Sequence, residues 1–242
     1  QPARRVDQPS AAELYERDAA AGIFARSYGD ALDYAERARQ IYAAQDRPRG
    51  AARMQAMIGR VLRRAGRHTE ARQHLADALT VLRPDPDSDT ATTLLELATL
   101  EIFEGSVTGP ALAAEALAMG EALDVEPALL ADLFTVGGFA HGFAGHRVQS
   151  AAYLREAARL AETVDDGVGL ARALLNLSDI LAQTDPVAAA ETAATAAEHA
   201  RRTGDREMLA VAFTNRAAAL IESGEWDQAE AVLAGAAADG LE

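Results

Sequence analysis

Eight arginines crowd into the stretch from Arg47 to Arg72, which contains a single acidic residue, Glu70. On a helix of 3.6 residues per turn, four of them fall within an arc of about 100°: Arg53, Arg60, Arg63 and Arg64. Guanidinium groups placed in this way can bind carboxylates or phosphates through paired hydrogen bonds. Alternatively, these arginines solvate a helix face or pair with Glu13 and Glu16 upstream. The pattern therefore predicts either an anion-binding face or an internal set of ion pairs.

Catalytic chemistry finds little support in the residue pattern. His141 and His146 are five residues apart, about 140° around a helix, so their side chains do not converge on a metal ion. The chain has no cysteine, no H-E-x-x-H motif and no nucleophile elbow. The Gly167–Gly169 segment lacks the third glycine of a nucleotide fingerprint. The sequence predicts a protein that is not an enzyme and uses no metal or cofactor.

Charge is distributed unevenly along the 242 residues, whose formal net charge is −14. Residues 1–83 hold 15 arginines and 10 acidic residues, whereas residues 84–242 hold 8 arginines and 27 acidic residues. This polarity allows self-association, in which the basic N-terminal end of one chain meets the acidic body of another. A nucleic-acid-binding regulator is a weaker alternative, because the acidic body would repel phosphates.

Composition favours a helical protein that stays out of the membrane. Alanine, leucine, glutamate and arginine are abundant, and these residues lose little side-chain entropy in a helix. No run of 18 apolar residues and no signal-peptide pattern is present, which predicts a cytoplasmic location. The chain begins without methionine and ends in Leu241-Glu242, an ending typical of a cloning scar. We therefore expect a domain excised from a longer protein.

Small residues recur about every 40 positions along the chain. The first series is Ala19, Gly59, Ala98, Gly138, Ser178 and Ala217. A second series follows 12 to 15 residues later: Ala31, Ala71, Ala113, Ser150, Ala190 and Ala229. Between the two series, four units carry a turn glycine: Gly66, Gly105, Gly145 and Gly224. Small residues let two antiparallel helices approach closely, so the pattern predicts helix pairs stacked as a solenoid.

The clearest unit, residues 52–84, resembles the tetratricopeptide repeat. Its small and large residues stand in the order that this family uses: Ile58-Gly59, Leu62, Ala71, Leu75 and Ala78. The last unit matches in the same way: Phe213, Ala217, Leu220, Gly224, Trp226, Ala229, Leu233 and Ala236. The period of about 40 residues exceeds the usual 34. Repeats of this length are similar to those in the sensor regions of large actinobacterial regulators, such as ATPase-containing LuxR-type activators.

The resemblance implies an all-α, right-handed solenoid of about six helix pairs over residues 11–238. The expected units lie near residues 11–46, 51–84, 90–124, 128–164, 168–204 and 206–238, after an N-terminal linker at 1–10. Turns inside the pairs are expected near residues 26–29, 64–68, 104–110, 144–147, 183–186 and 223–226, and the third turn is expected to be the longest. Ser10 and Glu13 form a predicted capping box, and Gly204-Asp205 is expected to end one helix and begin the next.

In this family the first helix of each pair lines a concave groove, and the resemblance places the four arginines in that groove. Equivalent positions farther along hold aromatic and amide side chains: Phe103, Phe139, Phe143, Asn176 and Asn215. The phenylalanines would accept apolar side chains of a partner, or they pack between repeats. In tetratricopeptide proteins the asparagine position often binds the backbone of an extended peptide, although these residues could also be ordinary surface asparagines.

Together these observations predict a non-catalytic scaffold or sensor module from a bacterial regulatory protein. Its partner would be a peptide, a protein surface or a small effector in the groove, anionic at one end and apolar in its middle. The alternative functions are homo-oligomerisation through the basic and acidic parts and, with less support, nucleic-acid binding.

Overall fold

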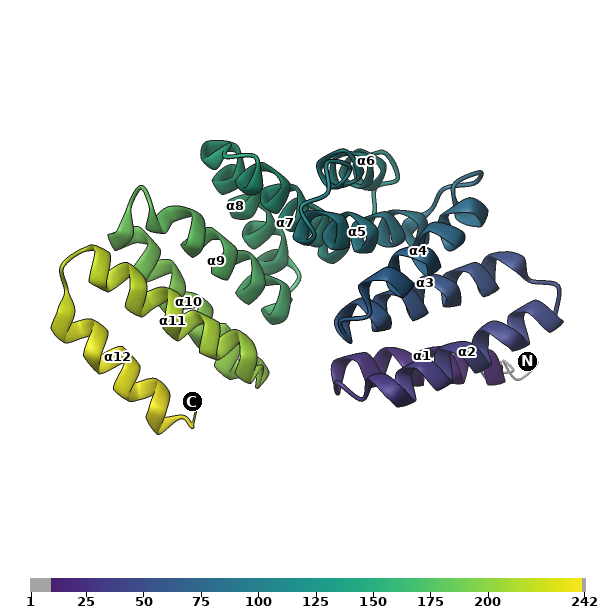
Figure 1. Cartoon of the computed structure of the whole chain (residues 1–242), viewed down its shortest axis with the longest axis horizontal. Helices are drawn as coiled ribbons and strands as arrows, with labels where there is room; N and C mark the ends of the chain where they lie inside the picture. The colour runs from purple at the N-terminus through teal and green to yellow at the C-terminus, as the bar shows by residue number, and fades with distance from the viewer. Residues whose placement is uncertain (1–9, 241–242) are drawn as a thin grey trace, which may run out of the picture. The chain divides into compact units, whose positions relative to one another are not determined.

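The computed structural model describes residues 10–240, and within this range the chain forms twelve α-helices and no strand (Figure 1). The helices are α1 (Ala11–Phe24), α2 (Tyr28–Ala44), α3 (Pro48–Arg64), α4 (His68–Leu82), α5 (Ser88–Phe103), α6 (Gly109–Ala122), α7 (Pro127–Phe143), α8 (Arg147–Thr163), α9 (Gly167–Ala182), α10 (Pro186–Thr203), α11 (Arg206–Glu222) and α12 (Trp226–Ala238). The all-α repeat architecture predicted from the sequence is confirmed. The predicted linker before Ser10 and the Leu241-Glu242 pair lie outside the described residues.

In chain order the helices alternate between leading helices (α1, α3, α5, α7, α9 and α11) and trailing helices (α2, α4, α6, α8, α10 and α12). Leading and trailing helices pack against each other as pairs in α1–α2, α3–α4, α7–α8, α9–α10 and α11–α12. The turns inside the pairs occupy residues 25–27, 65–67, 104–108, 144–146, 183–185 and 223–225. Each overlaps its predicted range, and the third turn is the longest, as expected. None of the described helices has the length and apolarity needed to cross a bilayer.

Glycine closes four of these turns in a left-handed backbone conformation. The φ angles of Gly66, Gly105, Gly145 and Gly224 lie between 70° and 83°. A side chain is disfavoured in this region because Cβ approaches the following carbonyl oxygen. The first pair uses Arg26 instead, with φ at 60°. The predicted turn glycines therefore have a backbone reason to be glycine.

The small residues of the first series are buried, and two of them, Gly59 and Gly138, lie where the two helices of a pair meet. A Cβ placed on Gly59 would lie 2.7 Å from Cγ of Leu75, and a Cβ placed on Gly138 would lie 2.7 Å from Cγ of Leu154. Carbon atoms in real interiors do not approach so closely. Glycine at these two positions therefore sets how near the helices can lie, which confirms the predicted packing role.

Helix ends follow the local signals in the sequence. Ser10 Oγ accepts a hydrogen bond from the backbone N–H of Glu13, whose carboxylate accepts one from the backbone N–H of Ser10, and this capping box opens α1. Gly204 ends α10 with φ at 73°, and the Asp205 side chain caps the start of α11. Pro186 is the first residue of α10, where its missing N–H is not needed.

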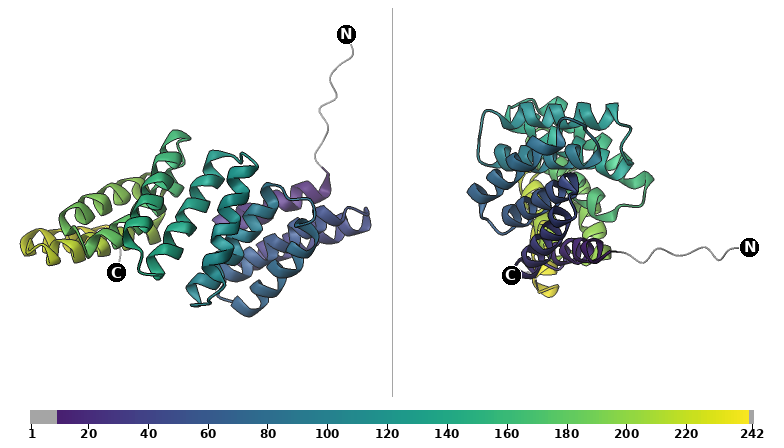
Figure 2. Two further views of the ribbon diagram at one scale, coloured as in Figure 1. Left: turned by 90° about the horizontal axis from the view of Figure 1, so that it is seen from above. Right: turned by 90° about the vertical axis from the view of Figure 1, so that its right-hand side faces the viewer.

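The chain divides into two compact units, one ending at Glu104 and the other beginning at Gly105. The first unit contains α1–α5, and its leading helices α1, α3 and α5 contact one another in that order. The second unit contains α6–α12, and a large cluster of buried alanines and leucines runs through it from α8 to α12. Figure 2 shows the helices of each unit following one another as layers. The boundary falls inside the third predicted repeat.

Charge differs between the two units. Residues 1–104 hold 15 arginines and 16 acidic residues, whereas residues 105–242 hold 8 arginines and 21 acidic residues. The first unit is therefore nearly neutral and the second strongly acidic. Trp226, the single tryptophan of the chain, begins α12 in the acidic unit and is 64% exposed.

Candidate functional site

Helix α3 carries five arginines and no acidic residue, and it lies between two acidic neighbours. Helix α1 has three acidic residues and one arginine, and α5 has three acidic residues and no arginine. Both helices contact α3. Opposite charges on adjacent leading helices attract one another, so much of the arginine charge is matched inside the first unit.

Arg53 is engaged on two sides. Its Nη2 lies 2.7 Å from Oε2 of Glu16 on α1, and that same oxygen accepts a hydrogen bond of 2.9 Å from the Tyr42 hydroxyl. Its Nη1 lies 3.8 Å from Oδ2 of Asp89 on α5. Glu16 is one of the two acids that the alternative interpretation of the cluster named. At this position the internal ion pair is observed.

Arg60 and Arg63 share one buried carboxylate, which comes from Glu96 on α5. Nε of Arg63 donates a hydrogen bond to Oε2 of Glu96 at 2.8 Å, and Nη2 of Arg63 lies 2.6 Å from the same oxygen. Nε of Arg60 lies 3.1 Å from Oε1. The Glu96 side chain is only 6% exposed. Burial alone would raise the pKa of Glu96, but the charges of Arg63 and Arg60 and the hydrogen bond from Arg63 hold that pKa below its usual value. Glu96 is therefore ionised inside the unit.

Positive charge remains on this part of α3, because one carboxylate faces two guanidinium groups. The Arg60 side chain is 37% exposed, and its Nε, which lies near Glu96, makes no hydrogen bond within residues 10–240. Arg64 follows at the end of α3, where it is exposed. The charge of Arg64 also contributes to lowering the Glu96 pKa.

Further ion pairs tie α5 to α3 and α4 along its whole length. At the start of α5, Asp87 pairs with Arg49 at 2.5 Å. At its end, Arg72 of α4 reaches both Glu101, at 2.5 Å, and Glu104. The sequence analysis paired the arginine cluster only with Glu13 and Glu16, and so it missed these downstream acids.

Exposed phenylalanines occupy one repeated position, the last residue of a leading helix. Phe24, Phe103 and Phe143 end α1, α5 and α7 and are 78%, 59% and 66% exposed. Arg64 holds the same position at the end of α3. Phe139 lies one turn before Phe143 and is half-buried. The sequence analysis missed Phe24, although its distance of 40 residues from Arg64 places it in the same series.

The two asparagines make contacts inside the second unit. Nδ2 of Asn215 on α11 donates to the carbonyl oxygen of Leu175, at 3.2 Å, and to Oγ of Ser178, at 3.1 Å, both on α9. Nδ2 of Asn176 donates to the carbonyl oxygen of Arg172 within α9, at 2.8 Å. Asn215 therefore fastens two neighbouring leading helices. A role for either residue in binding a peptide backbone stays a prediction.

The predicted site residues are thus distributed over both units. Five lie in the first unit: Arg53, Arg60, Arg63, Arg64 and Phe103. Four lie in the second unit: Phe139, Phe143, Asn176 and Asn215. Within the first group, Arg60 and Arg63 meet on Glu96, whereas Arg53 belongs to a separate network with Glu16. One continuous binding track over both groups stays a prediction.

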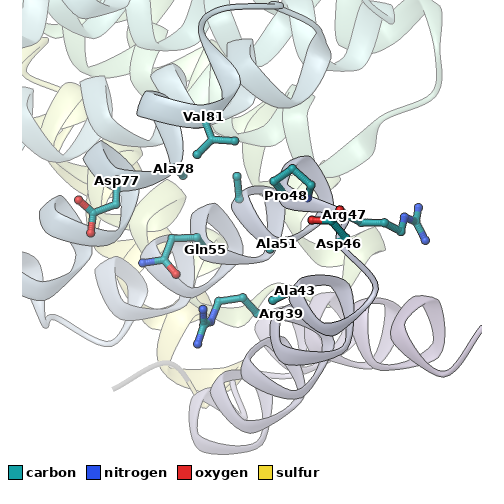
Figure 3. A pocket seen from close by; sticks show the side chains of 11 residues that line it. Arg39, Ala43, Asp46, Arg47, Pro48, Ala51, Gln55, Asp77, Ala78 and Val81 are labelled. Atoms are coloured by element: carbon teal, nitrogen blue, oxygen red, sulfur yellow. The ribbon is translucent and has the colours of Figure 1, made fainter.

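A cavity of about 370 Å³ opens in the first unit between α2 and α4, over the start of α3 (Figure 3). Its lining comes from three helices and the turn between α2 and α3: Arg39, Ala43, Asp46, Arg47, Pro48, Ala51, Ala52, Gln55, Asp77, Ala78 and Val81. Small apolar side chains form much of this wall, and two arginines balance two aspartates. The cavity includes none of the predicted site residues.

The histidines do not build a metal site. Within the described range, no group of three or more histidine, aspartate or glutamate side chains is placed to hold a metal ion. The ring centres of His141 and His146 are 5.9 Å apart, and the His141 ring also packs edge-on against Tyr153 at 4.8 Å. These rings form a local packing cluster between α7 and α8.

Searches by sequence found no matching family model and no matching curated protein. Solved structures do match. The Rap conjugation gene regulator of plasmid pLS20, in complex with the Phr* peptide, has a TM-score of 0.72 and 16% identity, covering 100% of this chain and 70% of that one. BtubC (BKLC) from P. vanneervenii has a TM-score of 0.68 and 17% identity, covering 94% of this chain and 90% of that one.

A third similar structure is a signal transduction ATPase with numerous domains (STAND) from Pyrococcus horikoshii, which has a tetratricopeptide repeat sensor. Its TM-score is 0.68 at 16% identity, and the match covers 96% of this chain but only 37% of that one. At such identities the likeness concerns the fold. The helix pairs, the buried small residues and these structural neighbours agree: residues 10–240 have the tetratricopeptide-repeat fold.

Proposed function

We propose that this chain is a non-catalytic module that binds a peptide or a protein surface, with an anionic group of the ligand on Arg60 and Arg64. The observation that carries the proposal is the uneven charge balance around Glu96. One buried carboxylate serves two guanidinium groups, and the Arg60 side chain is 37% exposed, so a ligand can also reach it. Several arginines around one anion bind it more tightly than a single exposed pair does.

The structural neighbours support a binding role of this kind. One of them, the Rap regulator, was solved with a peptide, and another, the STAND protein, carries its tetratricopeptide repeats as a sensor. This chain matches only 37% of the STAND protein. We accordingly place it in the sensor region of a larger bacterial regulatory protein, whose output would lie in another domain.

The surroundings of the arginines suggest the remaining chemistry of the ligand. In the order of the leading helices, exposed Phe24 and Phe103 stand before and after Arg64 at equivalent positions. Aromatic rings at such positions favour apolar side chains beside the anionic group. Phe139 and Phe143 would offer a similar surface in the second unit. Self-association has less support, since much of the α3 charge is already matched by α1 and α5.

The first test is selection of random 12-residue peptides on the immobilised protein, followed by fluorescence anisotropy with the selected peptide. Replacing Arg60 and Arg64 together with alanine should weaken binding by about tenfold or more, which corresponds to about 1.4 kcal/mol. Helix content should be unchanged. The matched control replaces Arg155 and Arg159, two exposed arginines on α8, and removes the same charge elsewhere.

Equal affinities for the wild type and the Arg60/Arg64 variant would refute the proposed site. An equal loss of peptide affinity in the variant without Arg155 and Arg159 would point to a general effect of net charge. A selected peptide without any acidic group would contradict the proposed ligand chemistry even if it bound tightly.

A further inference from the structure

The two arginines that share Glu96 are held in different ways. Arg63 gives one hydrogen bond and a second close ion-pair contact to Oε2 of Glu96 and is only 19% exposed, so it is fixed against α5. Nε of Arg60 lies 3.1 Å from the other carboxylate oxygen without forming a hydrogen bond, and the Arg60 side chain is 37% exposed. Glu96 therefore joins an anchored guanidinium to a more exposed one, which it holds by ionic attraction.

We infer that Glu96 is a positioning residue, which holds the Arg60 guanidinium in the orientation that receives the ligand anion. The inference rests on the proposed function, because it assumes that this anion binds Arg60. Glu96 itself is buried and does not touch the ligand. It restricts the rotamers of the Arg60 side chain before the ligand binds.

The physical basis is the cost of ordering a long side chain. A free arginine visits many rotamers, and binding must select one of them, which reduces affinity. The Glu96 carboxylate attracts Nε and so limits where the outer edge of the Arg60 guanidinium can lie. Two features keep the Glu96 carboxylate in place. Arg63 binds its second oxygen. Moving the carboxylate away would also leave the partly buried Arg63 charge without its partner, which costs free energy.

Glu96 also has an effect that should weaken the binding of an anion, and the competition between the two effects makes the inference testable. Its negative charge lowers the positive potential around Arg60 and Arg64. If Glu96 did nothing more than neutralise charge, its replacement by glutamine would strengthen the binding of an anion. If Glu96 positions Arg60, the same replacement should weaken binding.

The experiment compares Glu96→Gln, Glu96→Asp and the control Glu104→Gln in full-length protein. Glu104 follows directly after α5 and also carries a negative charge, but its ion-pair partners are Arg72 and His68. The first readout needs no ligand: the NMR order parameter of the Arg60 Nε–Hε group should fall in both Glu96 variants and stay unchanged in Glu104→Gln. Aspartate retains the negative charge but is shorter. A fall of the Arg60 order parameter in Glu96→Asp would therefore show that the position of the carboxylate matters and not only its charge.

The second readout is the anisotropy titration with the selected peptide. Each Glu96 variant should bind about three- to tenfold more weakly, the range expected for one side chain that must be ordered on binding. Tighter binding by Glu96→Gln, or unchanged Arg60 order in both variants, would overturn the positioning role. If a Glu96 variant fails to fold, Arg60→Lys provides the test, since lysine keeps the charge but lacks the planar fork that Glu96 orients. Wild-type affinity in Arg60→Lys would then overturn the inference.

The two proposals fail in different ways. If the Arg60/Arg64 alanine variant binds the peptide as well as the wild type does, the proposed function is wrong. If that variant binds weakly while the Glu96 variants bind normally, the arginine site stands and only the role of Glu96 is wrong.

Discussion

Gly138 illustrates how a single missing methyl group sets the distance between α7 and α8. A Cβ there would lie 2.7 Å from Cγ of Leu154, whereas a Cβ on Gly235 of α12 would meet no atom within 4 Å. Gly138→Ala should therefore lower the free energy of unfolding by about 1–3 kcal/mol, because the overpacking outweighs the better helix propensity of alanine. Gly235→Ala should raise it by about 0.5–1 kcal/mol, since only the propensity gain applies.

Thermal melts followed by circular dichroism would measure both effects. The prediction is that the two substitutions change the free energy of unfolding in opposite directions. A melting temperature that rises in Gly138→Ala would show that α8 does not pack on this position.

At the residue scale, the sequence located the arginines of the candidate site but not the carboxylates that hold them. The helical arc found Arg60 and Arg63 because both lie on one helix and the angle between them follows from spacing alone. Glu96 is 33 residues beyond Arg63 in the sequence, and its role depends on how α5 lies against α3. Its place in an apolar run, between Leu95 and Leu97, was the available signal. A charged residue buried in such a run needs a partner of opposite charge.

Among the elements, α5 is the helix whose attachment depends most on ionised acids. The charges of Arg63 and Arg60 overcome the effect of burial and lower the pKa of Glu96 below its ordinary value of 4.5. Hydrogen bonds from Arg72 and His68 lower the pKa of Glu104 in the same direction. A lowered pKa in the folded state contributes stability above pH 4.5 that is lost as the pH falls through the folded-state value. Asp89 opposes this trend, because burial raises its pKa.

We therefore expect α5 to lose protection against amide hydrogen exchange when the pH is lowered below about 4.5, after correction for the intrinsic exchange rate. Helix α10 provides the internal control, because its buried face consists of alanines. If α10 lost protection at a higher pH than α5 does, the attachment of α5 through ion pairs would be contradicted. Equal protection of α5 at neutral and acidic pH would contradict it as well.

The elements themselves were largely predictable from local signals. The capping box at Ser10, the left-handed glycines of the turns and the small residues at helix contacts each act within one helix pair. The division between α5 and α6 was not predicted, because it falls inside the third predicted pair, where the repeat pattern leads one to expect two helices packed together. The longer third turn, at residues 104–108, was the local feature at that boundary.

For the molecule as a whole, salt should affect the two units in opposite directions. The first unit is nearly neutral and holds its helices together with ion pairs, which screening weakens. The second unit has 21 acidic residues against 8 arginines within residues 105–242, so its like charges repel and screening relieves that repulsion. Raising sodium chloride from about 0.1 M to about 1 M shortens the screening length from about 10 Å to about 3 Å.

Hydrogen exchange measured against temperature should resolve this difference. We expect α3–α5 to open at a lower temperature in high salt and α9–α11 to open at a higher temperature. A shift of both units in the same direction would mean that ion pairs in the first unit contribute little net stability. Sedimentation at the same two salt concentrations would test the self-association alternative, which requires a larger species at low salt.

The position of Trp226 determines what an optical experiment on this protein can report. The indole ring is the only one in the chain and is already 64% exposed at the start of α12. Its emission should therefore change little when the first unit unfolds, and only modestly when α12 itself melts. Far-ultraviolet dichroism, by contrast, sums the signal of all the helices. A fluorescence transition that fails to coincide with the dichroism transition is usually read as a folding intermediate. In this chain the location of one fluorophore would by itself produce such a mismatch.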